Sequence, residues 1–227
     1  MLANNSCLVL IVAIGAAACD MPSAEILDAP RVLGLKSEPA NLVPGGEALL
    51  TALVFDAPAS LDWSLCEAAW APTEPLSCPT GAIALGSGNP LSITWPESLT
   101  SAWLQAVPGD GGALPAVKRV EVGTAADNPT VVAIATLAGP LPTTLAAGAT
   151  TDVVVTFPEA TASGQLVVSW YTTGGKLDPG RTLGNEAATL VAPMVAGPMR
   201  LIAVVREKAG GTSWTEATLT IGPGTGR

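Results

Sequence analysis

The sequence predicts an all-β protein, with two tandem antiparallel β-sandwiches following an N-terminal export segment. Turn-forming residues are frequent and spread along the chain, with 24 glycines and 20 prolines. This is typical of many short strands rather than of collagen or a disordered chain. Short β-branched runs lie between the turns. The second half repeats the pattern of the first at a spacing of about 100 residues, the size of one sandwich.

The bulk composition bounds the size and the partners of the protein. Its 227 residues can form one large domain or two smaller ones. Aromatic residues make up only 4% of the chain, so we expect a core of Ala, Val and Leu. The formal charge is −9, and the ten Lys and Arg are scattered along the sequence. Their one adjacent pair, Lys118 and Arg119, is interpreted as a solvated strand face. Without basic clusters, nucleic acid is excluded as a partner.

An uncharged apolar run opens the chain and ends at a cysteine. Residues 7–18 are apolar without interruption, close with three alanines, and are followed by Cys19 and Asp20. The run is shorter than the roughly 20 residues that a membrane-spanning helix needs. Its length matches the hydrophobic region of a signal peptide instead.

The end of this run resembles the lipobox of bacterial lipoproteins, in which a small residue precedes a modified cysteine. The resemblance implies that residues 1–18 are a cleaved signal peptide and that the Cys19 thiol carries a diacylglycerol. The alternative is an ordinary cleaved signal peptide, with Cys19 free or in a disulfide. We expect a location in a bacterial cell envelope, facing the periplasm or the exterior. Asp20 is similar to the inner-membrane retention signal of enteric lipoproteins, but the choice between inner and outer membrane stays open.

The rest of the chain divides into a tether and two modules. Residues 19–30 show no sustained hydrophobic period and contain two prolines, which is typical of a short linker. They are expected to form the lipidated tether. The two modules are expected at 31–123 and 128–222.

The repeat is clearest in the first strands of the two modules. The segment PGGEALLTALVFD starts at residue 44, and AAGATTDVVVTFP starts at residue 146. When Gly46 is aligned with Gly148, Leu53 is aligned with Val155. A tryptophan soon follows each segment, in LDWSLC and VVSWYTTGG. We therefore expect equivalent strands in the two modules.

The back halves of the modules match as well. Residues 101–112 parallel 198–211, and residues 117–123 parallel 216–222. Within each module, the two segments are joined through two consecutive glycines, which adopt the positive φ of tight turns at little cost. Apolar residues alternate with polar ones along these segments, as in strands with one buried face.

These features resemble bacterial Ig-like domains, which carry a tryptophan on a middle strand and close with a hairpin. The resemblance covers residues 30–222 and implies two tandem Ig-like antiparallel sandwiches. The chain lacks the inter-sheet cysteine pair of antibody domains. It also lacks a tyrosine corner, because its single tyrosine, Tyr171, directly follows Trp170 and so lies on the wrong strand. The whole pattern is similar to uncharacterised lipoproteins of myxobacterial type, a family with no established activity.

Two cysteines beyond the export segment are expected to form a local staple. Cys66 and Cys78 form an even pair in an oxidising compartment, where a disulfide is the usual state. They lie too close in sequence to bridge opposite sheets. A catalytic thiol would need a base, commonly histidine, and the chain has none. The staple is expected to hold an irregular insertion in the first module.

The motif search favours a protein without catalytic, cofactor or metal sites. The lack of histidine excludes Ser-His-Asp relays, Cys-His pairs and His-bearing zinc sites. Two alternatives stay open. Paired carboxylates could hydrolyse glycosides, and Asp127 and Asn128 in the stretch 123–131 faintly resemble a cadherin-like calcium linker. Calcium needs about six to eight oxygen ligands, so this stretch is interpreted as a turn.

The six tryptophans supply the one candidate contact residue. Trp63 and Trp170 occupy matching strand positions and are expected in the cores. Three others could be core or half-exposed: Trp95, Trp103 and Trp214. Trp70 lies inside the expected cysteine loop and is the best candidate for contact with a partner or a sugar ring. The alternative is that it folds back over a sheet edge.

Together these features predict a non-catalytic, lipid-anchored cell-envelope protein with a role in adhesion, scaffolding or accessory binding. The expected partners are the membrane, through the anchor, and an envelope protein or polysaccharide. The alternative is a small carbohydrate-binding or carboxylate-dependent hydrolytic module. Because Ig-like folds host many roles, the fold does not decide between them.

Overall fold

Seventeen strands and no helix make up the part of the chain that the structure describes. This computed structural model describes residues 25–56, 60–66, 82–99, 101–109, 116–123, 125–158 and 166–223. The strands of the first module are β1 (Arg31–Glu38), β2 (Glu47–Phe55), β3 (Leu61–Cys66), β4 (Ile83–Ser87), β5 (Leu91–Thr94), β6 (Ser101–Pro108) and β7 (Ala116–Glu121). Those of the second are β8 (Ala133–Thr136), β9 (Gly139–Pro140), β10 (Thr144–Ala146), β11 (Thr150–Thr156), β12 (Leu166–Thr172), β13 (Lys176–Asp178), β14 (Arg181–Leu183), β15 (Ala188–Val191), β16 (Gly197–Glu207) and β17 (Thr212–Gly222).

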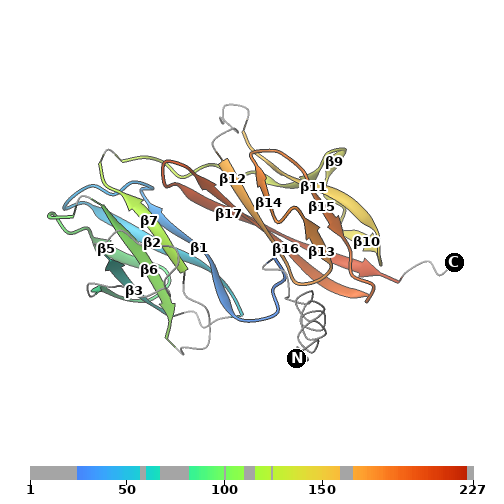
Figure 1. Ribbon diagram of the computed structural model, residues 1–227, viewed down its shortest axis with the longest axis horizontal. Coiled ribbons are helices and arrows are strands. Elements are labelled where there is room, and N and C mark those ends of the chain that lie inside the picture. The colour runs from blue at the N-terminus through green and yellow to red at the C-terminus, as the bar shows by residue number, and fades with distance from the viewer. Residues whose placement is uncertain are drawn as a thin grey trace, which may run out of the picture.

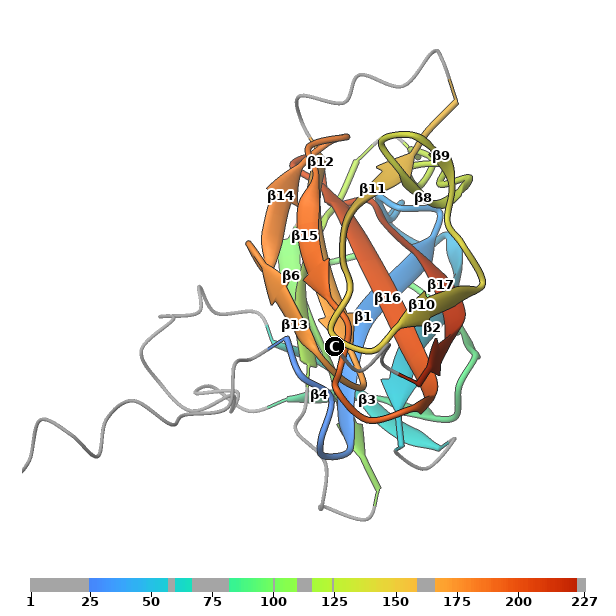
Figure 2. The ribbon, with the colours of Figure 1, turned by 90° about the vertical axis from the view of Figure 1, so that its right-hand side faces the viewer.

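The strands form two sandwiches that lie side by side along the long axis (Figure 1). In the first module the sheet β1-β2-β5 packs on the sheet β4-β3-β6-β7. In the second, β13-β15-β11-β8-β9 packs on β10-β17-β16-β12-β14. Figure 2 shows the second module from its outer end. Pairing within the sheets is antiparallel except between β10 and β17. The predicted all-β fold with antiparallel sandwiches is confirmed.

The tryptophan strands have the same register in both modules. On β3, Trp63 lies opposite Ala106 of β6, and on β12, Trp170 lies opposite Ala203 of β16. Directly opposed side chains in an antiparallel pair lie about 5 Å apart. A methyl group on the partner strand therefore leaves room for the indole. Both tryptophans are buried, as expected from their matching positions.

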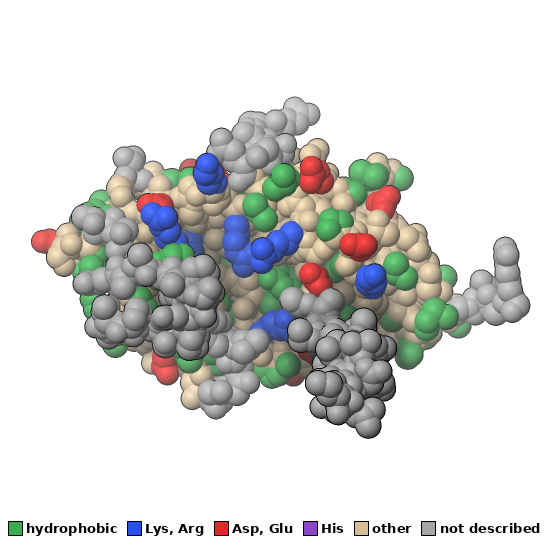
Figure 3. All heavy atoms as spheres, in the orientation of Figure 1, with side chains coloured by type: hydrophobic (Ala, Val, Ile, Leu, Met, Phe, Trp, Pro, Cys, Tyr) green, Lys and Arg blue, Asp and Glu red, His purple; other side chains and the backbone are tan. Residues whose placement is uncertain are grey.

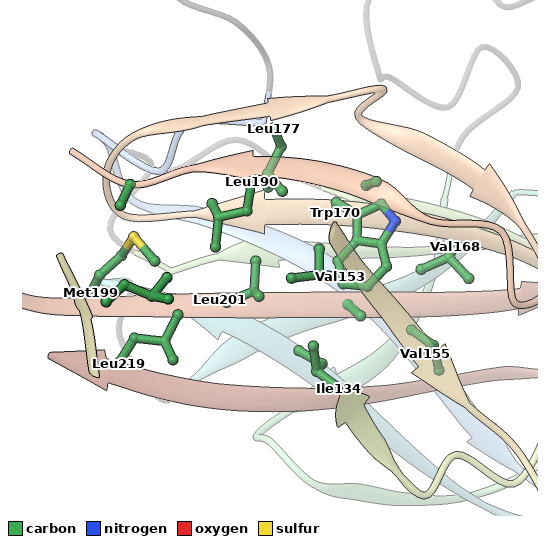
Figure 4. Close-up of a cluster of buried hydrophobic side chains, with 14 of the residues drawn as sticks. Ile134, Val153, Val155, Val168, Trp170, Leu177, Leu190, Met199, Leu201 and Leu219 are labelled. Atoms are coloured by element: carbon green, nitrogen blue, oxygen red, sulfur yellow. The ribbon is translucent and has the colours of Figure 1, made fainter. Parts of the chain in front are cut away.

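Each buried indole also satisfies its polar atom. Trp63 Nε1 donates to the carbonyl oxygen of Gly88 at 2.6 Å, and Trp170 Nε1 donates to Thr182 Oγ1 at 3.0 Å. Figure 4 shows Trp170 among aliphatic side chains of both sheets of the second module, including Val153 and Val168. A buried N–H without a partner would cost about 1–3 kcal/mol. The paired indole therefore fixes the core without that cost.

The first strand of the repeat differs from its expected alignment by one residue. Gly45 and Gly148 share a positive φ, 69° and 71°, and each lies two residues before its strand. The structure therefore matches Gly148 with Gly45 rather than with Gly46. The shift puts Val155 in its module's core but turns Leu53 to the opposite face of β2. On that outer face Leu53 is buried as well, in a cluster with Ile202 and Val204 of the second module.

Candidate functional site

The two modules are joined by a hydrophobic core of their own. The outer face of β1 and β2 packs on the outer face of β16 and β17. The buried residues of this junction core are Leu27, Leu33, Leu53, Ile202 and Val204, with Phe55, Tyr171 and Trp214 packed against them. The tandem modules are thus held by side-chain packing, and not only by the chain that links them.

A bulge in β1 brings this strand against the second module. The register of β1 on β2 shifts between Val32 and Gly34, so that Leu33 and Gly34 both face outward. A Cβ on Gly34 would lie 3.1 Å from Val204 Cγ1 and 3.7 Å from Trp214. The missing side chain therefore allows the backbone of β1 to approach the second module closely.

Asn128 bridges the modules with both polar atoms of its side chain. Its Nδ2 donates to the carbonyl oxygen of Ser37 at 2.8 Å, in the first module. Its Oδ1 accepts from the backbone N–H of Thr212 at 2.8 Å, in the second. The stretch interpreted as a simple Asn-Pro turn is thus a clamp. Within the described residues, no group of three or more Cys, Asp or Glu is placed to hold a metal ion.

The end of the expected tether pairs with the second module before the first module begins. The backbone N–H of Thr172 donates to the carbonyl of Glu25 at 2.9 Å, and that of Leu27 donates to the carbonyl of Thr172 at 2.8 Å. Leu27 is buried in the junction core. Arg31 caps this segment by donating to the carbonyl of Ile26 at 2.9 Å. Residues 25–27 are therefore part of the folded body.

A groove beside the junction collects basic side chains. It consists of two adjoining hollows of about 640 and 270 Å³ that share Arg206, Glu207 and Lys208. The larger hollow also includes Arg181 on β14, and the smaller includes Lys118 and Arg119 on β7. We call this feature the cationic groove. Figure 3, in the orientation of Figure 1, shows Lys and Arg side chains gathered at the middle of this face, over β7, β12 and β14.

The floor of the cationic groove is the outer face of β12. Val167, Ser169 and Tyr171 alternate with the core-facing residues of this strand and line the larger hollow, with Ser169 buried among them. Arg206 Nη1 donates to Ser169 Oγ at 3.0 Å, and its Nη2 donates to the carbonyl of Leu33 at 2.8 Å. The guanidinium thus spans both modules while it lines the groove.

Lys118 lies deeper in the same groove. Its Nζ donates to Ser37 Oγ at 3.1 Å. Burial lowers the pKa of Lys118 from its ordinary 10.5 to about 8, and the charges of Arg206 and Lys36 add to the effect. The interpretation of Lys118 and Arg119 as a solvated strand face therefore holds for the exposed Arg119 but is wrong for Lys118.

A second hollow, of about 650 Å³, lies along the other side of β1 and contains Glu38, Asp127 and Trp214. We call it the acidic hollow. Carboxylates beside an aromatic ring are what a carbohydrate-binding or hydrolytic site would require. In this hollow Lys36 contacts both a carboxylate and the aromatic ring. Its Nζ lies 2.6 Å from Glu38 Oε1 and 5.5 Å from the centre of the Trp214 ring.

Three of the four candidate site residues lie outside the described residues: Cys19, Trp70 and Cys78. Cys66 ends β3 and is buried, with 1% of its surface exposed, and its pairing with Cys78 stays a prediction. In the part of the chain that the structure describes, no helix is long and apolar enough to cross a membrane.

The cationic groove is the feature that sequence reasoning missed. Its five cations come from three separate regions of the sequence, so they look scattered until the modules pack together. A weak signal was present in β16, where Arg206 follows a run of apolar residues at an outward position.

No family model matches the sequence, and no curated protein matches it. Among solved structures, the chain is similar to the CbhA fibronectin(III)-like modules of Clostridium thermocellum, with 12% identity, 84% of this chain and 94% of that chain covered, and a TM-score of 0.30. Murine CEACAM1b gives 10% identity, 86% and 99% coverage, and 0.29. Escherichia coli alpha-2-macroglobulin gives 11%, 87% and only 17% of its own chain, and 0.34. These likenesses concern the fold alone.

Proposed function

We propose that this protein is a non-catalytic, lipid-anchored component of a bacterial cell envelope that acts as a binding or scaffold module. The observation that carries the proposal is the junction: two sandwiches joined by a buried core and a polar clamp into one body with a recessed groove. A pre-formed body of this kind presents a surface without first having to order it, which favours binding.

The anchor is assigned to Cys19 on the lipobox resemblance. Five residues separate Cys19 from Glu25, whose carbonyl is bonded to β12. Even fully extended, the chain from Cys19 to Glu25 spans about 20 Å. Lipidation would therefore hold the body close to the membrane surface, with the second module nearest the attachment.

Cys19→Ala tests the anchor. The variant should leave the membrane fraction and appear with the soluble envelope proteins, because a thiol is needed to carry the diacylglycerol. The mass of the native protein should show the first 18 residues removed and acyl chains added. If the variant still fractionates entirely with membranes, the anchor is not at this residue. Ser6→Ala, within the leader, is the matched control and should fractionate as the native protein does.

The acidic hollow supports hydrolysis as the alternative function. Two carboxylates flanking a glycosidic bond would be needed, one as acid and one as base or nucleophile. The ion pair of Glu38 with Lys36 favours a structural role for this carboxylate. Release of reducing sugar from envelope polysaccharide, abolished by both Glu38→Gln and Asp127→Asn in folded protein, would establish the alternative and overturn the non-catalytic proposal.

A further inference from the structure

The cationic groove concentrates positive charge in a protein that is acidic as a whole. The chain has ten Lys and Arg and a formal charge of −9. Five of these cations line the groove: Lys118, Arg119, Arg181, Arg206 and Lys208. Two carboxylates line it, Glu121 and Glu207. The groove is therefore a local positive site in a chain with a negative net charge.

Most of this charge is not neutralised within the described residues. Among these residues, the ion pair within the groove joins Arg119 Nε to Glu121 Oε1 at 3.1 Å. Lys118, Arg181, Arg206 and Lys208 take part in none of the other ion pairs of the described residues. Clustered cations repel each other, and a bound anion would relieve this repulsion. The lowered pKa of Lys118 is due first to burial, and the charges of Arg206 and Lys36 add to it.

The strand register spaces the two guanidinium groups across the floor of the groove. Arg181 of β14 lies opposite Ser169 of β12, and Arg206 of β16 lies opposite Val167 of β12. The two arginines are thus on either side of one strand and two residues apart along it. Strand spacing and rise put their Cα atoms roughly 12 Å apart. The groove suits an elongated ligand with more than one anionic group rather than a single small ion.

The surroundings select among anionic ligands. The edge strand beside the groove, β14, has three residues, too few for an added peptide strand to gain many backbone hydrogen bonds. Duplex nucleic acid would be repelled by the net negative charge of the chain. The exposed Arg181 and Lys208 suit a narrow chain that carries anionic groups along its length.

We propose that the cationic groove binds an acidic polysaccharide, with Arg181 and Arg206 receiving carboxylates of the sugar chain and Lys208 and Lys118 contributing positive charge. Guanidinium groups match carboxylates through paired hydrogen bonds. The inference rests on the proposed function, because it names the partner class of that non-catalytic envelope module.

The test is binding of oligogalacturonate to the full-length protein purified in mild detergent, followed by titration calorimetry. Arg181→Gln should weaken binding about tenfold or more, the loss expected for one charge-assisted hydrogen-bonding group. Arg181 is exposed and outside the junction core, so this variant should fold. Arg206→Gln tests the second position but also removes a junction contact. Lys176→Gln on β13 is the matched control for loss of one positive charge.

Each result decides for or against the proposal. Binding that is lost in Arg181→Gln, kept in Lys176→Gln, and absent for neutral dextran supports it. No binding of oligogalacturonate, equal loss in both variants, or equal affinity for poly-glutamate or anionic lipid vesicles would overturn it. Membrane fractionation of Cys19→Ala is a separate measurement, so failure of the anchor and failure of the groove are distinguishable.

Discussion

At the scale of single residues, the most unusual group is the ammonium of Lys118. It lies partly buried beside two other cations and has one hydrogen bond from Nζ, to Ser37 Oγ. The unfolded chain keeps this proton up to a pKa of 10.5, whereas the folded protein releases it near 8. Stability should therefore rise with pH between these two values, because the unfolded state there binds more protons.

Lys118→Met should make the protein more stable at pH 7, by about 1–3 kcal/mol, because it removes a charge that burial penalises. The variant should also lack the rise in stability between pH 8 and 10.5. Urea unfolding at pH 7 and pH 10 measures both effects. Lys176→Met, at an exposed position on β13, should leave stability and its pH slope unchanged. A Lys118→Met protein with the pH slope of the native one would contradict the assignment.

Residue patterns predicted part of this structure and missed the rest for physical reasons. Trp63 and Trp170 were predicted in the cores, because alternation and the repeat both pointed there. Leu53 was aligned with Val155, because a period of two marks an apolar face without saying whether it meets its own module or a neighbour. The cationic groove was not predicted, since packing between modules, rather than local sequence, brings Arg181 and Lys118 to one site.

At the scale of elements, the bulge of β1 decides how closely the modules approach. Without the extra residue, Leu33 and Gly34 would point to opposite faces of the strand. With it, both face the second module, one filling the junction core and the other leaving space for Val204. The bulge is thus the local feature on which the junction is built.

Gly34→Val should destabilise the protein by about 1–3 kcal/mol, because the added side chain overpacks against Val204. Gly123→Val is the matched control, since a Cβ there meets nothing within 4 Å. Thermal unfolding and limited proteolysis measure the difference. Equal melting temperatures for the two variants would show that β1 does not pack on the second module as described.

At the scale of the whole molecule, the two sandwiches should unfold together. The junction core and the Asn128 clamp give each module contacts that depend on the other. In most tandem domains joined by a linker, relative motion is the default expectation. Here a buried hydrophobic interface and a two-sided hydrogen-bonded clamp argue for one cooperative unit.

Asn128→Ala should lower the stability by about 2–3 kcal/mol, because it removes two hydrogen bonds and leaves a carbonyl and an N–H unpaired at the junction. The single unfolding transition should also separate into two, one for each module. Asp127→Ala, the exposed neighbour in the same segment, is the control and should keep one transition. Calorimetry distinguishes the outcomes, and an unchanged single transition in Asn128→Ala would contradict the clamp.

The path of the chain at residues 25–27 has a mechanical consequence. Because this segment is hydrogen-bonded to Thr172 before β1 begins, tension on the N-terminus enters the body through the later sandwich rather than the earlier one. If a protease cut the connection between the sandwiches, the two fragments would stay associated, because the N-terminal fragment also pairs with the second module. The folded body would thus stay closed under both tension and cleavage. The module that comes first in the sequence is not the one nearest the point of attachment.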